Sequence, residues 1–195
     1  MVSEDKNAIV DGPFGTQLKV EEYCNEGIPV YEMEMLNNSF IVDDFQHYIS
    51  EEKYQSVKRS TVKNGDIVIS KTGTLGLLGI VCSEFEKGLI VSRLAKITPN
   101  ELKLGKYTLF TYLNKLTNSG YWLNKAGGST MPIINNSTLE NVDVLYPNND
   151  LFLRFEECIK PLYEKIYILQ KQNKELQKLK KEEMALFLSG QAIIR

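Results

Sequence analysis

The 195-residue sequence is poor in the residue types on which most enzymes and metal proteins depend. It has a single histidine, His47, and its three cysteines, Cys24, Cys82 and Cys158, are far apart and show no metal-ligand spacing. It also lacks a Gly-x-x-x-x-Gly-Lys-Ser/Thr phosphate loop and the Gly-rich or Asn-Pro-Pro-aromatic motifs of a methyltransferase. We therefore expect a non-catalytic chain with reduced thiols that binds neither a metal nor a cofactor.

Long apolar runs are missing as well. No stretch approaches the roughly 18 apolar residues of a membrane span, and the first six residues are too polar for a signal peptide. Hydrophobic residues nevertheless make up 43% of the chain, which is enough for a core. These features predict a soluble cytoplasmic protein with one ordinary domain and an appendage, and with no membrane contact.

An excess of positive charge is also absent. The chain has a formal net charge of −2, and residues 1–150 are net acidic whereas residues 151–195 are net basic. Because bulk electrostatics would not draw an acidic domain to a polyanion, any nucleic-acid binding must depend on local patches or on a second subunit.

Residues 1–149 read as a mixed α/β globule of the α+β class. Alternating or β-branched segments predict strands at 28–35, 66–70, 77–82, 95–99 and 142–146. Helical spacing predicts helices at 106–117 and 121–125, with Ser50 capping a helix at 51–57 and Ser137 with Glu140 opening a helical turn.

Residues 150–190 predict one long helix, followed by a short tail at 191–195. Asp150 is placed as its N-cap, Pro161 should kink or split it, and Gly190 should end it. The helix either packs on its own domain or pairs with another helix, and its many Lys, Glu and Gln residues favour pairing. A heptad seam predicts the dimerisation residues, with one polar position that would set register: Ile159, Leu162, Ile166, Leu169, Asn173 and Leu176.

Two segments rich in glycine and hydroxyl residues, 65–76 and 127–132, suit contact with a phosphate backbone. They let backbone N–H groups approach a partner closely, and the alternatives are an ordinary hairpin turn for the first and a solvated loop for the second. The candidate DNA contacts lie in these segments, in the continuation of the second one to residue 136, in the turn after residue 11 and at scattered cations: Thr16, Gln17, Lys19, Lys58, Arg59, Lys71, Thr72, Thr74, Arg93, Gly128, Ser129, Thr130, Asn135 and Asn136. We expect Lys71 to anchor phosphate and the 128–136 loop to read bases.

Taken in order, several short segments resemble one half of the specificity (S, or HsdS) subunit of type I restriction-modification systems. They are VDGPFGTQL at 10–18, GIPV at 27–30, YIS at 48–50, GDIVISKTGTLG at 65–76, SRLA at 92–95, GGSTMPIIN at 127–135 and the terminal helix closing on LSG at 188–190.

The resemblance implies a target recognition domain that reads one half of a bipartite double-stranded DNA site, and a helix that docks the methyltransferase (M) subunits. The M subunits would carry the S-adenosylmethionine chemistry, and the restriction (R) subunit would join through them. The usual subunit has two recognition domains and two helices. We therefore expect a half-subunit that forms a homodimer or pairs with another half S subunit. The alternative is a truncated fragment that only binds proteins through its helix.

Overall fold

The computed structural model describes residues 7–128, 131–144 and 148–189, and its centre is a five-stranded sheet. Strand β4 pairs parallel with β8, and the other neighbours in this sheet are antiparallel. The order across the sheet is β1 (Ile9–Asp11), β10 (Leu94–Ile97), β7 (Ile67–Ser70), β8 (Leu78–Val81) and β4 (Ser39–Ile41).

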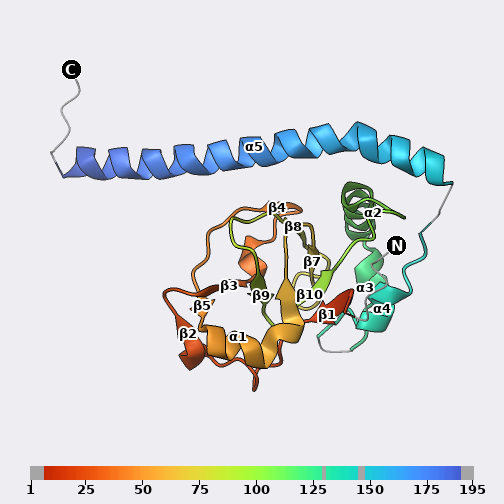
Figure 1. The fold of residues 1–195 in the computed structure, drawn as a ribbon, viewed down its shortest axis with the longest axis horizontal. Helices are drawn as coiled ribbons and strands as arrows, with labels where there is room; N and C mark the ends of the chain where they lie inside the picture. Colours follow the sequence, from red (N-terminus) through yellow and green to blue (C-terminus); the bar gives the residue numbers. More distant parts are fainter. Residues whose placement is uncertain (1–6, 129–130, 145–147, 190–195) are drawn as a thin grey trace.

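A second five-stranded sheet lies against the first (Figure 1). It mixes short antiparallel pairs with one parallel pair, β3 with β9. Its order is β2 (Tyr23–Cys24), β5 (Tyr48–Ile49), β3 (Ile28–Tyr31), β9 (Gly88–Ile90) and β6 (Thr61–Val62).

Apolar side chains fill three layers between these sheets and the helices. In β7, Ile67 and Ile69 point into the cluster shared with the helices, whereas Val68 points into the cluster between the sheets. All three are fully buried because both faces of the strand are covered. A third cluster joins the second sheet to helix α1 (Glu51–Val57) through Val30 and Tyr54.

Most of the predicted elements of the globular part are confirmed. Helices α1, α2 (Lys106–Asn118) and α3 (Tyr121–Lys125) occur as expected, and Ser50 caps α1 by accepting a hydrogen bond from the Lys53 N–H. Strands β7, β8 and β10 match three predicted strands within one or two residues. The described part of the domain also contains three short 3-10 helices: η1 (Val20–Glu22), η2 (Met33–Met35) and η3 (Lys58–Ser60).

Three local predictions for the globular part are wrong. The strand expected over 28–35 ends at Tyr31, and the chain continues into η2. Helix α4 (Asn136–Glu140) is preceded by Asn135 at the N-cap, so Ser137 lies inside the helix and does not cap it. Residues 142–144 form no strand, and the rest of the strand predicted to end at residue 146 lies outside the described residues.

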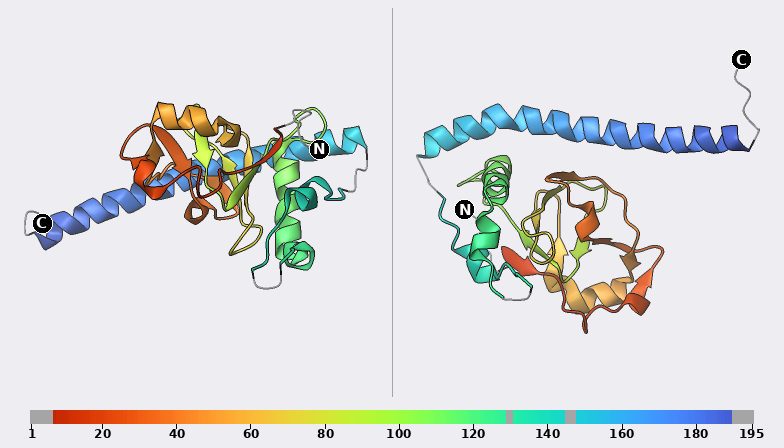
Figure 2. Two further views of the ribbon diagram at one scale, coloured as in Figure 1. Left: turned by 90° about the horizontal axis from the view of Figure 1, so that it is seen from below. Right: turned by 180° about the vertical axis from the view of Figure 1, so that it is seen from behind.

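Helix α5 (Asn149–Leu188) is 40 residues long and runs across one side of the domain, extending well beyond it (Figures 1 and 2). Asn148, rather than Asp150, caps it by accepting the Leu151 N–H at 2.8 Å. Pro161 lies within the helix without splitting it, and the predicted stop at Gly190 lies outside the described residues. None of the helices in the described residues is long and apolar enough to cross a membrane.

One face of α5 packs on its own domain, and the adjoining face is exposed. Tyr163 stacks on Tyr107 with ring centroids 5.0 Å apart, and Ile159 contacts the same core cluster. In contrast, Leu162 is 63% exposed and Ile166 is 40% exposed. The packing alternative therefore holds for one face of α5, whereas pairing through the exposed face stays a prediction. Ile159 lies on the domain side rather than on the exposed seam.

The Glu156 side chain on α5 forms hydrogen bonds with the first turn of α2. Its carboxylate accepts the backbone N–H groups of Tyr107 at 3.2 Å and Thr108 at 2.8 Å, as well as the Thr108 hydroxyl. Helix α2 has Gly105 at its N-cap and no side-chain cap of its own, and a Cβ at Gly105 would lie 2.2 Å from the Glu156 carboxyl carbon. The long helix therefore supplies the missing cap to the short one.

Replacing Glu156 with alanine should lower the free energy of unfolding by about 1–2 kcal/mol, because the first turn of α2 loses its acceptor. Urea denaturation followed by circular dichroism measures this change. The matched control is Glu157→Ala, which removes an exposed carboxylate from the same helix and should change the free energy by less than about 0.5 kcal/mol. Equal effects of the two substitutions would contradict the cap.

Candidate functional site

Three of the motifs singled out in the sequence meet at the side chain of Lys71. Lys71 directly follows β7, Asp11 ends β1, and Asn136 begins α4. The Lys71 ammonium donates to Asp11 Oδ1 at 2.6 Å and to Asn136 Oδ1 at 2.9 Å. We call these three side chains the Lys71 junction. It joins parts of the chain that are 60 and 65 residues apart.

Backbone hydrogen bonds hold the same segments together. The Lys71 N–H donates to the Arg93 carbonyl at 2.8 Å, and the Lys71 carbonyl accepts the Ile134 N–H at 3.0 Å. A Cβ at Gly12 would lie 2.0 Å from the Val91 carbonyl oxygen, so only glycine fits beside Asp11. The turn after β1, the end of β7 and the loop before α4 are therefore fixed relative to one another.

The junction argues against the phosphate-anchoring role predicted for Lys71. The residue is only 8% exposed, and its ammonium is engaged by a carboxylate and an amide oxygen. A lysine in this position is not a free surface cation, so it is unsuited to anchoring a phosphate without rearrangement. The sequence could not show this, because no local pattern links Lys71 to Asp11.

A surface pocket of about 360 Å³ adjoins the junction. Its polar lining includes the exposed Arg59 from η3, the amide side chain of Gln17 and that of Asn136. Phe14, which is 68% exposed, stands at the same pocket and was not among the predicted contacts. The aromatic residue in the Gly-Pro-Phe-Gly turn was the available signal for it. A guanidinium, two amides and an exposed aromatic ring are groups that bind phosphates and base edges.

Several of the other predicted DNA contacts do not line this pocket. Thr16, Lys58 and Arg93 are exposed, and Lys58 neighbours Arg59 in η3. Lys19 is also exposed, and its backbone N–H, together with the Lys53 ammonium, lowers the pKa of the Glu22 carboxyl group below its ordinary value.

Thr72 and Thr74 occupy the tight turn between β7 and β8, which packs toward α3 rather than into the pocket. The Ser70 hydroxyl closes this turn by donating to the Thr74 carbonyl at 2.5 Å. A Cβ at Gly76 would lie 2.1 Å from the Trp122 ring, which accounts for the glycine there. Thr72 is half-buried and Thr74 is exposed.

The second polar loop is closed by a pair of backbone hydrogen bonds between Gly127 and Ile133, at 3.0 and 2.9 Å. Gly128 has a φ of +95°, and a Cβ there would lie 2.6 Å from the Met131 carbonyl oxygen. Asn135, next to α4, is exposed and makes no side-chain capping bond. Ser129 and Thr130 lie outside the described residues.

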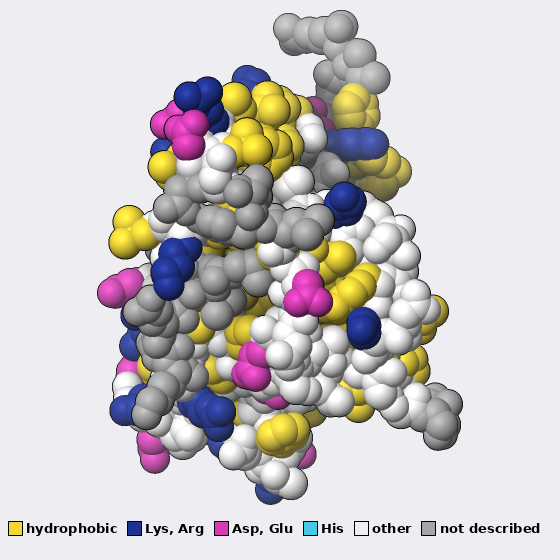
Figure 3. Space-filling view, turned by 90° about the vertical axis from the view of Figure 1, so that its right-hand side faces the viewer, with side chains coloured by type: hydrophobic (Ala, Val, Ile, Leu, Met, Phe, Trp, Pro, Cys, Tyr) yellow, Lys and Arg dark blue, Asp and Glu magenta, His cyan; other side chains and the backbone are white. Residues whose placement is uncertain are grey.

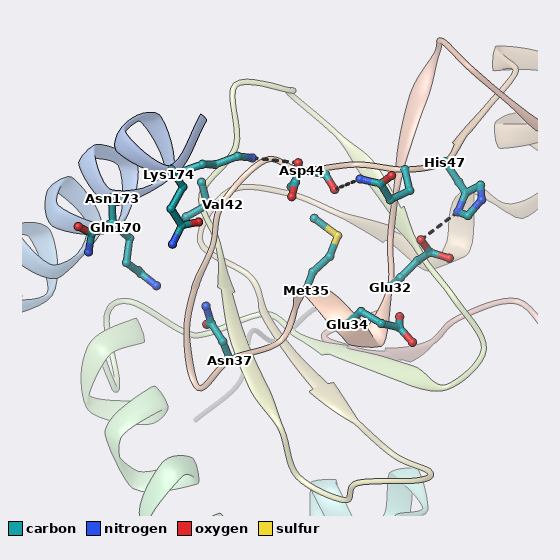
Figure 4. Close-up of a pocket in the computed structure, with 12 residues that line it drawn as sticks. Glu32, Glu34, Met35, Asn37, Val42, Asp44, His47, Gln170, Asn173 and Lys174 are labelled. Atoms are coloured by element: carbon teal, nitrogen blue, oxygen red, sulfur yellow. Dashed lines mark hydrogen bonds and ion pairs between the residues drawn. The ribbon is translucent and has the colours of Figure 1, made fainter. Parts of the chain in front are cut away.

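A larger cavity, of about 610 Å³, separates α5 from the segment between β3 and β5 (Figure 4). Lys174 on α5 lies 3.4 Å from Asp44, and on the opposite wall His47 Nδ1 lies 3.0 Å from Glu32. Asn173, the polar residue of the predicted seam, also lines this cavity. The described residues contain no group of three or more side chains placed to hold a metal ion.

An apolar groove of about 360 Å³ runs between α2 and the first turns of α5. Leu151 and Phe155 contribute to it from α5, and they are 53% and 43% exposed. Figure 3 shows hydrophobic side chains gathered near the top of this side of the molecule. The groove and the exposed seam of α5 are the apolar surfaces that this part of the structure presents.

The chain has relatives of known class. Residues 15–178 match the family model described as type I restriction modification DNA specificity domain. The specificity subunit of the type I restriction enzyme MjaVIII from Methanocaldococcus jannaschii is 23% identical over 195 residues, which cover 96% of this chain and 45% of that protein. The chain thus spans less than half the length of this curated relative.

Solved structures share the fold at low sequence identity. The HsdS subunit from Thermoanaerobacter tengcongensis has a TM-score of 0.58 at 18% identity, over 94% of this chain and 43% of that one. The S subunit of a type I restriction-modification system from M. genitalium has a TM-score of 0.59 at 13% identity, over 93% and 43%. A chain from a study of complex assembly and conformational transition of the type I R-M system has a TM-score of 0.60 at 20% identity, over 91% and 41%.

Proposed function

Because the chain belongs to the type I restriction modification DNA specificity domain family, we propose that it reads one half of a bipartite double-stranded DNA site. The observation that carries this proposal is that the turn after β1, the η3 segment and the start of α4 meet at one polar pocket, with Arg59, Gln17 and Asn136 in its lining. In this proposal Arg59 takes over the phosphate-anchoring role first expected of Lys71, and the amides contact base edges.

The chain would act without chemistry of its own. We propose that S-adenosylmethionine is bound by partner methyltransferase subunits and that a restriction subunit joins the complex through them. The assembled complex would act on DNA in the cytoplasm. The net negative charge of residues 1–150 supports this proposal, because long-range electrostatics contribute little to the affinity of an acidic domain for DNA. Most contacts to phosphate would then come from the partner.

Helix α5 would supply the assembly surface. Its exposed seam at Leu162, Ile166, Leu169 and Leu176 would pair with a second copy of this chain or with another half S subunit. A symmetric pair would present two identical recognition domains, and so would read two identical half-sites related by a twofold axis.

A second candidate function is an interaction module that binds methyltransferase subunits without reading DNA. The apolar groove between α2 and α5 favours it, because this surface suits a protein partner and not a polyanion. In this case the polar pocket beside the Lys71 junction would have no role in DNA binding.

Co-purification with a type I methyltransferase subunit, followed by methylation mapping and competition binding, tests the proposal. The complex should methylate and bind sites that share a defined half-site, whereas the isolated chain should neither methylate nor cleave DNA and should bind it weakly. Arg59→Ala should weaken binding to cognate and scrambled duplexes about equally, and should reduce the salt slope by roughly one. A complex that assembles but shows no sequence preference would favour the interaction module.

A further inference from the structure

The side-chain amide of Asn136 has a fixed polarity. A lysine ammonium has only donors, so the atom that faces Lys71 Nζ at 2.9 Å must be the amide oxygen. If the amide flipped, its NH2 group would face the ammonium, donor against donor. Within the described residues, the NH2 group of Asn136 donates to no other protein group, and Asn136 lines the polar pocket.

The ammonium that sets this polarity is itself held firmly. Its second acceptor, Asp11 Oδ1, lies at 2.6 Å, and only 10% of the Lys71 side chain is accessible. The backbone on both sides of Lys71 is also tied, through the Arg93 carbonyl and the Ile134 N–H. The Lys71 side chain therefore cannot turn away from the Asn136 oxygen without also breaking its bond to Asp11, and the fixed backbone keeps it from shifting as a whole.

We infer that Asn136 is a specificity-determining residue that presents a hydrogen-bond donor to the ligand, and that Lys71 and Asp11 are the positioning residues that enforce this. The inference rests on the proposed DNA-reading function. In the major groove, a fixed donor selects a base edge that accepts, such as guanine N7 and O6, adenine N7 or thymine O4, over the cytosine N4 amino group. Among the described residues, no capping bond or lysine fixes the amide of the exposed Asn135 in the same way.

Asn136→Asp separates the two roles of this side chain. An aspartate still accepts from Lys71, so the junction is preserved, but the donor is lost and a second acceptor takes its place. In the complex with the methyltransferase subunit, preference at one position of the mapped half-site should fall about tenfold to a hundredfold. The preferred base at that position should also change toward cytosine, whose N4 amino group donates hydrogen bonds to carboxylates. A purely structural role would not change the preferred base.

Two variants control for charge and for folding. Ser137→Asp adds the same charge at the next, exposed residue and should weaken binding to all duplexes alike, without changing the preferred base. Asn136→Ala removes the donor without adding charge and should relax preference at the same position. It therefore keeps the inference testable if the aspartate variant does not fold.

The buried Lys96–Asp66 ion pair provides the control for the positioning residues. Its atoms are 3.9 Å apart, and its side chains are only 12% and 6% accessible, but it lies outside the polar pocket. Lys96→Met should destabilise the fold and leave base preference unchanged, whereas Lys71→Met should destabilise the fold and also relax base preference at the position that Asn136 reads. Unchanged preference at every position in Asn136→Asp would overturn the inference. A complex of the unaltered chain that reads no sequence would instead overturn the proposed function.

Discussion

Replacing Lys71 with methionine should lower the free energy of unfolding by about 3 kcal/mol, because it leaves the Asp11 carboxylate without its partner in a largely enclosed site. The Asp11 side chain is 25% accessible, so water can reach it, and we expect the lower end of the usual range for a broken buried pair. Methionine keeps most of the aliphatic volume, which limits the loss of packing. Chemical denaturation measures the change.

Two further variants identify the cause of that loss. Asp11→Asn in the Lys71→Met background removes the unpaired carboxylate charge and should recover part of the lost free energy of unfolding. Lys160→Met breaks an exposed pair on α5 whose side chains are 60% and 52% accessible, and should change the free energy by less than about 0.5 kcal/mol. If Lys71→Met were as mild as Lys160→Met, the junction would not contribute to stability.

Replacing Ile166 and Leu169 together with aspartate should abolish self-association of the chain at tens of micromolar protein. Both residues lie on the exposed seam of α5, at 40% and 45% exposure, and their apolar surface is what a partner helix would cover. Burying charges there should weaken assembly by at least about 3 kcal/mol, given roughly 1.5–3 kcal/mol for each buried aliphatic side chain. Sedimentation velocity measures the oligomeric state.

Ile168→Asp is the matched control for the seam. Ile168 is 47% exposed, but it does not lie on the seam. Each residue of an α-helix is rotated by roughly 100° from the one before it, so Ile168 points away from the side that carries Ile166 and Leu169. Self-association should therefore survive its replacement. Circular dichroism checks that the helix is intact in every variant. A monomeric unaltered chain at tens of micromolar, with α5 fully helical, would contradict the pairing assigned to this face.

The sequence by itself determined the elements whose signals are local. The β-branched run at 67–70, the heptad spacing after residue 151 and the Ser50 cap each correspond to an observed element, because strand alternation, helix periodicity and capping depend on near neighbours. The strand was predicted too long, to residue 35, because the alternation of apolar and polar residues continues past its end into η2, where the backbone turns. The segments that line the polar pocket could also be named from the sequence, as turns and loops.

The tertiary structure alone decided what those segments do to one another. It placed Asp11 and Asn136 on the Lys71 ammonium, and so turned a predicted phosphate anchor into a buried junction that fixes an amide. It also divided the apolar residues of α5 between two faces, with Ile159 against the domain and Leu162 exposed. Contacts between residues 60 or more positions apart leave no periodic trace in the chain. They follow from the packing of sheets and helices, which the sequence specifies only as a whole.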